Sequence, residues 1–180
     1  VNGEYAGGLV GKVEGDTLVI KRSRMLVGTL MGLRYCGGLV GGIAGSGLVK
    51  ISDSYNDAFN VEGTSTDIGG FIGFIGSTRD GNLIEGCTSS ATVYGSMSVG
   101  GMIGQSKGVK LTDIYVQANK IISELGYCGG IAGYNVGKME VVNSQVFHSS
   151  SANYKEDVIG SGNISSVGGF VGHALAGSDV

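Results

Sequence analysis

The amino-acid sequence predicts an all-β protein, a parallel β-helix (β-solenoid) with about 30 residues and three short strands in each coil. Three observations predict this fold. A pattern of two glycines, two apolar residues and a third glycine occurs six times at a nearly constant spacing, which is typical of repeat proteins. The residues beside the pattern are mostly β-branched, aliphatic or aromatic, which favours strands. Glycine, asparagine and aspartate lie between the apolar segments, where tight turns require them.

The glycine pattern sets the repeat length. Its copies lie 29 to 32 residues apart, except that the fifth repeat has 39 residues. A helix is a poor choice for these segments, because each glycine costs about 1 kcal/mol relative to alanine in a helix. We therefore assign the pattern to a strand in which glycine permits close backbone approach. The predicted structural repeat motif comprises Gly7, Gly8, Gly11, Gly37, Gly38, Gly41, Gly69, Gly70, Gly73, Gly100, Gly101, Gly104, Gly129, Gly130, Gly133, Gly168, Gly169 and Gly172.

The two apolar residues inside each pattern form two columns, a column being the residues that occupy the same place in successive repeats. Neighbouring residues of a strand point to opposite faces, so only one column is expected to enter the core. Unless a bulge redirects it, the other column forms an apolar stripe that another subunit, a neighbouring domain or a flanking segment covers. The predicted interaction stripe is Leu9, Leu39, Phe71, Met102, Ile131 and Phe170.

Two further strands are expected in each repeat. The second contains an apolar residue followed three residues later by a small or apolar one, as at Ile51 and Ser54 or at Ile84 and Cys87. The third is expected over 26–30, 58–61, 91–94 and 118–122. Three strands close a triangular coil, and the whole chain, 1–180, forms one solenoid domain. We expect it to be a segment of a longer array, with a loop insertion within 148–163 that explains the longer fifth repeat.

Charge, hydropathy and the spacing of the cysteines exclude several classes of partner and a disulfide framework. The formal net charge is −3 and the 12 lysines and arginines are scattered, so neither nucleic acid nor an anionic membrane surface is an expected partner. No apolar run reaches the 18 to 20 or so residues that membrane insertion requires. Cys36 and Cys128 share a place in repeats three coils apart, about 14 Å at the usual strand spacing, which is too far for a disulfide. We expect both thiols, and that of Cys87, to be free and buried.

The residues that carry common chemistries are not arranged for catalysis. The two histidines, His148 and His173, lack the His-Glu-x-x-His spacing of zinc peptidases. Asp53 and Asp113 share a repeat position, but they lie two coils apart, about 10 Å, and we expect them to be solvated. The glycine-rich loops lack the Gly-Lys-Ser/Thr of a phosphate-binding loop. We therefore predict no catalytic, cofactor-binding or metal-binding residues.

The sequence resembles the GLUG repeat, on the evidence of Gly-Gly-Leu-Val-Gly at 7–11 and 37–41, followed by Ile-x-x-Ser/Cys segments at 51–54 and 84–87. Such repeats are found in large bacterial surface and secreted proteins, including adhesin-like proteins and non-catalytic regions of immunoglobulin A-specific zinc metallopeptidases. The resemblance implies a β-helical stalk or binding module and does not imply catalysis. It also implies a location at the cell surface or outside the cell.

We therefore expect a non-catalytic structural or adhesive module, with a protein or glycan surface, flanking domains or identical subunits as partners. Two alternatives stay open. One is a carbohydrate-active β-helix enzyme or a segment of a larger peptidase, which three or more converging carboxylates in a groove would favour. The other is a filament subunit that joins identical chains through its open ends or its apolar stripe.

Overall fold

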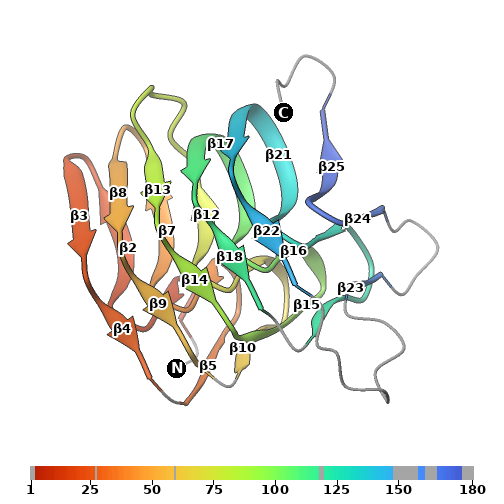
Figure 1. Ribbon diagram of the computed structural model, residues 1–180. Coiled ribbons are helices and arrows are strands. Elements are labelled where there is room, and N and C mark those ends of the chain that lie inside the picture. The colour runs from red at the N-terminus through yellow and green to blue at the C-terminus, as the bar shows by residue number, and fades with distance from the viewer. Residues whose placement is uncertain are drawn as a thin grey trace.

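The computed structural model describes residues 3–26, 28–58, 60–117, 120–147, 158–160 and 166–175. Within these ranges every regular element is a β-strand, and every pairing between strands is parallel. Successive coils stack side by side from the red N-terminal to the blue C-terminal part of Figure 1. The predicted fold class, a parallel β-solenoid, is confirmed. No helix in the described ranges has the length and apolar character needed to span a membrane.

Each of the first three coils contains five strands, and the later coils merge two of them into one long strand. The first coil has β1 (Ala6–Gly7), β2 (Val10–Glu14), β3 (Thr17–Lys21), β4 (Arg24–Met25) and β5 (Thr29–Gly32). The second has β6 (Cys36–Gly37), β7 (Val40–Ala44), β8 (Leu48–Ser52), β9 (Tyr55–Asn56) and β10 (Asn60–Gly63). The third has β11 (Thr66–Gly69), β12 (Ile72–Ile75), β13 (Leu83–Glu85), β14 (Thr88–Ser89) and β15 (Thr92–Gly95).

The remaining coils follow the same plan. The fourth has β16 (Met97–Gly100), β17 (Ile103–Thr112), β18 (Tyr115–Val116) and β19 (Ile121–Ser123). The fifth has β20 (Cys128–Gly129), β21 (Ala132–Val142), β22 (Gln145–Val146) and β23 (Val158–Gly160). The last two strands are β24 (Val167–Gly168) and β25 (Val171–Ala174). Of the predicted insertion within 148–163, only 158–160 lies in the described residues.

The strands assemble into four sheets rather than the three predicted. The motif sheet has the order β1-β6-β11-β16-β20-β24, and the closing sheet has the order β5-β10-β15-β19-β23. The arched sheet contains β2, β7 and β12 on one side and β3, β8 and β13 on the other, joined by β17 and β21, which pass through both; β25 pairs with β21. The narrow sheet, β4-β9-β14-β18-β22, was not predicted, because strands of two residues leave no periodic pattern in the sequence.

Equivalent residues of successive coils pair in register. In the arched sheet Ile51 pairs with Ile20 on one side and Ile84 on the other, as the predicted second strand requires. The third strand also forms, as the closing sheet, although its strands begin up to three residues later than expected. In the motif sheet Cys36 pairs with Ala6 and Ile68, and all three are buried. These stacked aliphatic columns form the core.

The prediction of an outward-facing apolar stripe is wrong for the inner coils. Leu39, Phe71, Met102 and Ile131 are fully buried, and so are their neighbours Val40, Ile72, Ile103 and Ala132. The reason is a bend at the second glycine and the first apolar residue of each pattern, where the chain passes from the motif sheet to the arched sheet.

Hydrogen bonds show how the bend redirects the side chains. The amides of Leu39 and Val40 both donate to the carbonyl of Phe71, each at 3.0 Å, and the amides of Phe71 and Ile72 share the carbonyl of Met102 in the same way. The backbone is therefore bent rather than extended at this point, the alternation of a strand is interrupted, and both side chains point inward. Only Leu9 and Phe170 of the predicted stripe are exposed, in coils at the edges of the sheets.

Candidate ligand-binding surfaces

A column of left-handed residues forms the corner between the arched and narrow sheets. Asp53, Asp113 and Asn143 have φ angles of 49°, 53° and 48°, a region that aspartate, asparagine and glycine tolerate better than other residues. Gly86 occupies the same corner with φ of 59°. The shared position of Asp53 and Asp113 therefore has a structural cause, the backbone of the corner.

In the second and fifth coils the serine that follows the corner holds it in place. The Ser54 hydroxyl donates to the carbonyl of Ser52 at 2.8 Å and accepts from the amide of Ser23 in the preceding coil at 3.2 Å. Ser144 makes the equivalent bonds three coils later, donating to the carbonyl of Val142 and accepting from the amide of Ile114. The Ile-x-x-Ser/Cys segment thus satisfies backbone groups that the corner leaves unpaired.

The three cysteines are free and buried. Burial raises the pKa of the Cys36 thiol to about 12 and that of Cys87 to about 11. Because the thiolate is the reactive form, these two side chains act as small core residues.

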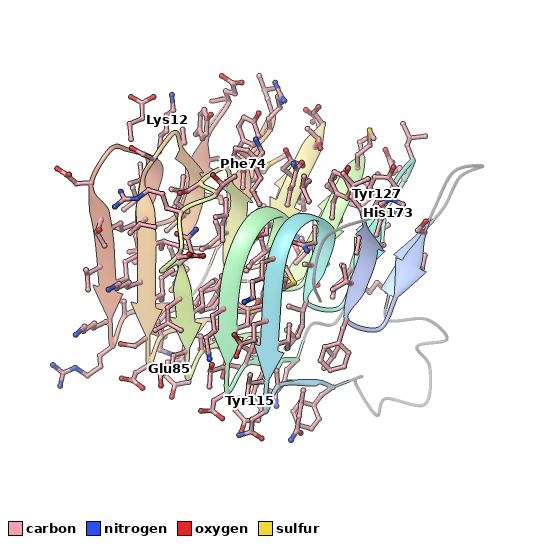
Figure 2. The ribbon with its side chains drawn as sticks, turned by 90° about the horizontal axis from the view of Figure 1, so that it is seen from above. Lys12, Phe74, Glu85, Tyr115, Tyr127 and His173 are labelled. Atoms are coloured by element: carbon pink, nitrogen blue, oxygen red, sulfur yellow. The ribbon has the colours of Figure 1, made fainter. Side chains whose placement is uncertain are left out.

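His173 packs against tyrosines on the outside of the solenoid. Its ring centroid lies 4.5 Å from that of Tyr127 and 5.6 Å from that of Tyr134. Figure 2 shows Tyr127 and His173 together on one edge, opposite Tyr115. His148 lies outside the described residues. Within the described part of the chain, no three His, Cys, Asp or Glu side chains are placed to hold a metal ion.

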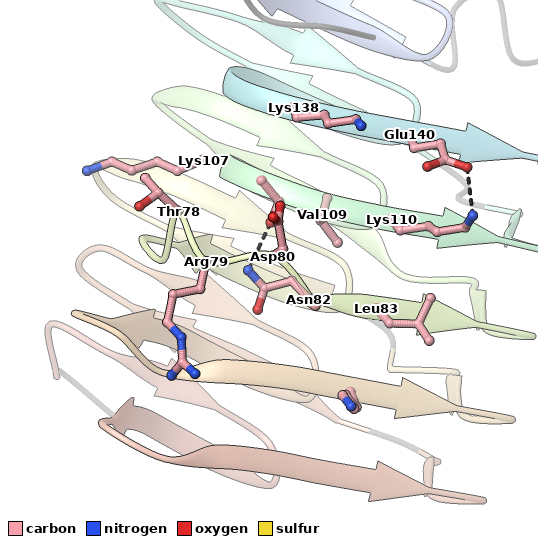
Figure 3. Close-up of a pocket in the computed structure, with 13 residues that line it drawn as sticks. Thr78, Arg79, Asp80, Asn82, Leu83, Lys107, Val109, Lys110, Lys138 and Glu140 are labelled. Atoms are coloured by element: carbon pink, nitrogen blue, oxygen red, sulfur yellow. Dashed lines mark hydrogen bonds and ion pairs between the residues drawn. The ribbon is translucent and has the colours of Figure 1, made fainter.

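The third coil leaves the arched sheet between β12 and β13. Residues 76–82 form a loop there, whereas β17 and β21 continue through the same region of the next two coils. Asn82 anchors the loop: its Oδ1 accepts from the amide of Val49 at 3.0 Å, and its Nδ2 donates to the carbonyl of Gly108 at 2.9 Å. The displaced loop borders a groove of about 370 Å³ (Figure 3), which we call the loop groove.

The loop groove is rich in positive charge. Two of its cations have partners: Lys110 pairs with Glu140 at 2.7 Å, and the Arg79 guanidinium donates to the carbonyl of Ser46 at 2.9 Å. The hydrogen bond from Lys110 lowers the pKa of the Glu140 carboxyl. Five cations line the groove against two carboxylates, a local excess of three positive charges on a chain of net charge −3. The cations are Lys50, Arg79, Lys107, Lys110 and Lys138, and the carboxylates are Asp80 and Glu140.

A second hollow, which we call the tyrosine face, lies on the outside of the narrow sheet. Tyr55, Thr88 and Tyr115 follow one another in register in β9, β14 and β18, and Arg24 lies beside Tyr55 in β4. Arg24 is paired with Asp57 at 2.6 Å. Tyr55 is 45% exposed. The residues lining the hollow are Arg24, Tyr55, Asp57, Thr88, Ser90, Tyr115 and Gln117.

Sequence reasoning missed both surfaces. The segment Arg79-Asp80-Gly81-Asn82 has the composition of a tight turn, and the lysines that face it come from three other strands. Tyr55 and Tyr115 do share a place, one residue after Ser54 and Ile114, and this recurrence is the signal that a search for exposed columns would have found. Comparison with family models, with curated proteins and with solved structures gives no match for this chain.

Proposed function

We propose that this chain is a non-catalytic structural and adhesive module of a bacterial cell-surface or secreted protein, and that its tyrosine face binds a glycan. The observation that carries the proposal is the in-register series Tyr55, Thr88 and Tyr115 on the outside of the narrow sheet. The resemblance of the glycine pattern to the GLUG repeat supports the bacterial surface location.

The spacing of the two tyrosines suits a linear sugar chain. Adjacent parallel strands lie about 4.8 Å apart, so Tyr55 and Tyr115, two coils apart, are separated by about 10 Å along the solenoid. Tyrosine offers an apolar ring and a hydroxyl on the same side chain, which matches the apolar C–H face and the hydroxyl rim of a pyranose. Successive sugars are therefore expected to follow successive coils.

The tyrosine face is also ordered before any ligand binds. The Tyr115 ring stacks on Phe147 with centroids 6.3 Å apart, and Arg24 is fixed by its pair with Asp57. Both tyrosines lie on paired strands rather than on loops. A preorganised surface loses less entropy on binding, which favours recognition of a flexible chain such as an oligosaccharide.

The charge distribution favours adhesion over the enzyme alternative. A glycosidase needs at least two carboxylates placed across the scissile bond, and a groove with three or more would favour a catalytic or calcium site. The tyrosine face has one carboxylate, Asp57, which is paired with Arg24. The loop groove has two, of which Glu140 is paired with Lys110.

The test is binding of the purified chain to a microarray of neutral and acidic oligosaccharides. Replacing both Tyr55 and Tyr115 with alanine is expected to weaken binding to the recognised glycan about tenfold or more, the loss of two aromatic contacts. Tyr94→Ala is the matched control, because Tyr94 is an exposed tyrosine on a different sheet, and it is expected to bind as the parent does. A parent chain that binds no glycan, or an equal loss in the control, contradicts the proposal.

A further inference from the structure

We propose that the loop groove is a second binding site, for a linear anionic glycan that carries carboxylate or sulfate groups. This site lies on the arched sheet and is separate from the tyrosine face. It rests on four properties of the groove: its charge, its direction, its floor and its preformed geometry.

The positive charge of the groove favours an anionic ligand. Lys107 and Lys138 lie on the adjacent strands β17 and β21 and both border the groove. The two carboxylates of the groove leave three of its five positive charges unbalanced. An anionic ligand neutralises this excess of positive charge, so charge complementarity favours its binding.

The direction of the groove favours a linear ligand. Lys50 pairs in register with Leu83, Leu83 with Lys110, and Lys110 with Glu140. These residues therefore step along the solenoid at about 4.8 Å per coil. A polymer with acidic groups on successive sugars meets cations from several coils, whereas a single small anion meets only one or two.

The floor and rim fit a sugar. Leu83 is partly exposed in the groove and provides apolar surface for the C–H face of a ring, and Gly108 leaves open space, because a Cβ placed there would have no neighbour closer than 3.7 Å. Asp80 offers a carboxylate on the rim that accepts hydrogen bonds from sugar hydroxyls.

The groove is preformed. Asn82 ties the loop to the coils on both sides, and the Arg79 guanidinium is held on the carbonyl of Ser46. Figure 3 shows Lys110 drawn toward Glu140, while Lys107 and Lys138 carry no such pair in the view. The ammonium group of Lys107 lies 5.9 Å from the centroid of the Phe74 ring. Lys107 and Lys138 are therefore the side chains whose removal most directly tests the site.

The experiment measures binding of the whole chain to four probes by isothermal titration calorimetry: polygalacturonate, heparin, neutral dextran and a single-stranded DNA oligonucleotide. We expect polygalacturonate or heparin to bind, with an affinity that falls as salt is added, and dextran not to bind at this site. Lys107→Gln combined with Lys138→Gln is expected to lower the affinity for the anionic glycan about tenfold, because two charge-assisted contacts are lost.

The control is Lys12→Gln combined with Lys21→Gln, which removes the same charge from exposed strands outside the groove and is expected to change binding less than about twofold. An equal loss in both double variants indicates non-specific attraction and overturns the site. DNA that binds as tightly as the glycans, or no binding of either anionic glycan, also overturns it. Binding at the tyrosine face is expected to survive in the groove variant, so the two proposals fail independently.

Discussion

Gly73→Ala is expected to lower the free energy of unfolding by about 4 kcal/mol or more, one of the largest effects of any single methyl group in this chain. A Cβ on Gly73 would lie 2.5 Å from the amide nitrogen of Cys36, 2.5 Å from the carbonyl oxygen of Gly41 and 2.5 Å from the carbonyl carbon of Tyr35. All three atoms are backbone atoms of the preceding coil, so a change of side-chain rotamer cannot relieve the clash. Urea denaturation followed by circular dichroism measures the loss.

The first coil provides a matched control for this substitution. Gly11 occupies the same place in the glycine pattern, but a Cβ there would meet only the carbonyl oxygen of Tyr5, at 3.4 Å. We expect Gly11→Ala to change stability by about 1 kcal/mol or less. Equal destabilisation by the two substitutions would show that the third glycine is required for some reason other than the close approach of neighbouring coils.

Asp67→Asn is expected to stabilise the protein at neutral pH by about 3 kcal/mol. Asp67 is 3% exposed within β11 and has φ of 64°, a conformation that asparagine accepts well. Burial raises the pKa of its carboxyl from 3.8 to about 6, although hydrogen bonds from Thr66 and Ser98 and the charge of Arg34 oppose the shift. A shift of about 2 pKa units corresponds to about 3 kcal/mol between the two protonation states.

The direction of the pKa shift determines the pH range in which Asp67→Asn stabilises the protein. Because the pKa of Asp67 is higher in the folded than in the unfolded chain, the folded state is favoured where the carboxyl is protonated, below pH 4. That stability is lost as the pH rises from 4 through 6. The benefit of Asp67→Asn is therefore expected to be near zero at pH 3.5, to grow between pH 4 and 6, and to level off above pH 7. Thermal unfolding across this range gives the curve.

Asp53→Asn serves as the control for the pH series. Asp53 also adopts a left-handed φ, of 49°, but its side chain is exposed. We expect its substitution to leave stability nearly unchanged at every pH. A benefit of Asp67→Asn that is constant from pH 3.5 to 8 would mean that titration of the buried carboxyl is not its origin.

The repeat spacing was enough to predict the coils, because parallel stacking places residues of equal repeat position opposite each other. The pairing of Cys36 with Ala6 and Ile68 follows directly from that rule. The burial of both Leu39 and Val40 does not, because alternation along a strand fails where two amides share the carbonyl of Phe71. A bend with this bonding has no signature beyond the glycines themselves.

The binding surfaces were harder to predict than the fold. The loop groove depends on lysines from the second, fourth and fifth coils that face a loop of the third. To predict that these lysines lie close together, the register of each coil must be known to one residue. That register shifts between Ser106 and Gly108, where β17 pairs with β21. The tyrosine face lies on strands of two residues, too short for periodicity to reveal which side chains point outward.

The stacking of coils is tested most directly by distances between spin labels. Lys21, Glu85 and Val142 occupy one column of the arched sheet, with Ser52 and Thr112 between them. Cysteines introduced at positions 21 and 85, and separately at 21 and 142, carry the labels, while the three native cysteines are buried. At about 4.8 Å per coil, the backbone separations are about 10 Å and about 19 Å, so the second distance is expected to exceed the first by about 10 Å. Two equal distances, or a shorter one for the pair 21 and 142, would contradict a solenoid whose coils stack in register.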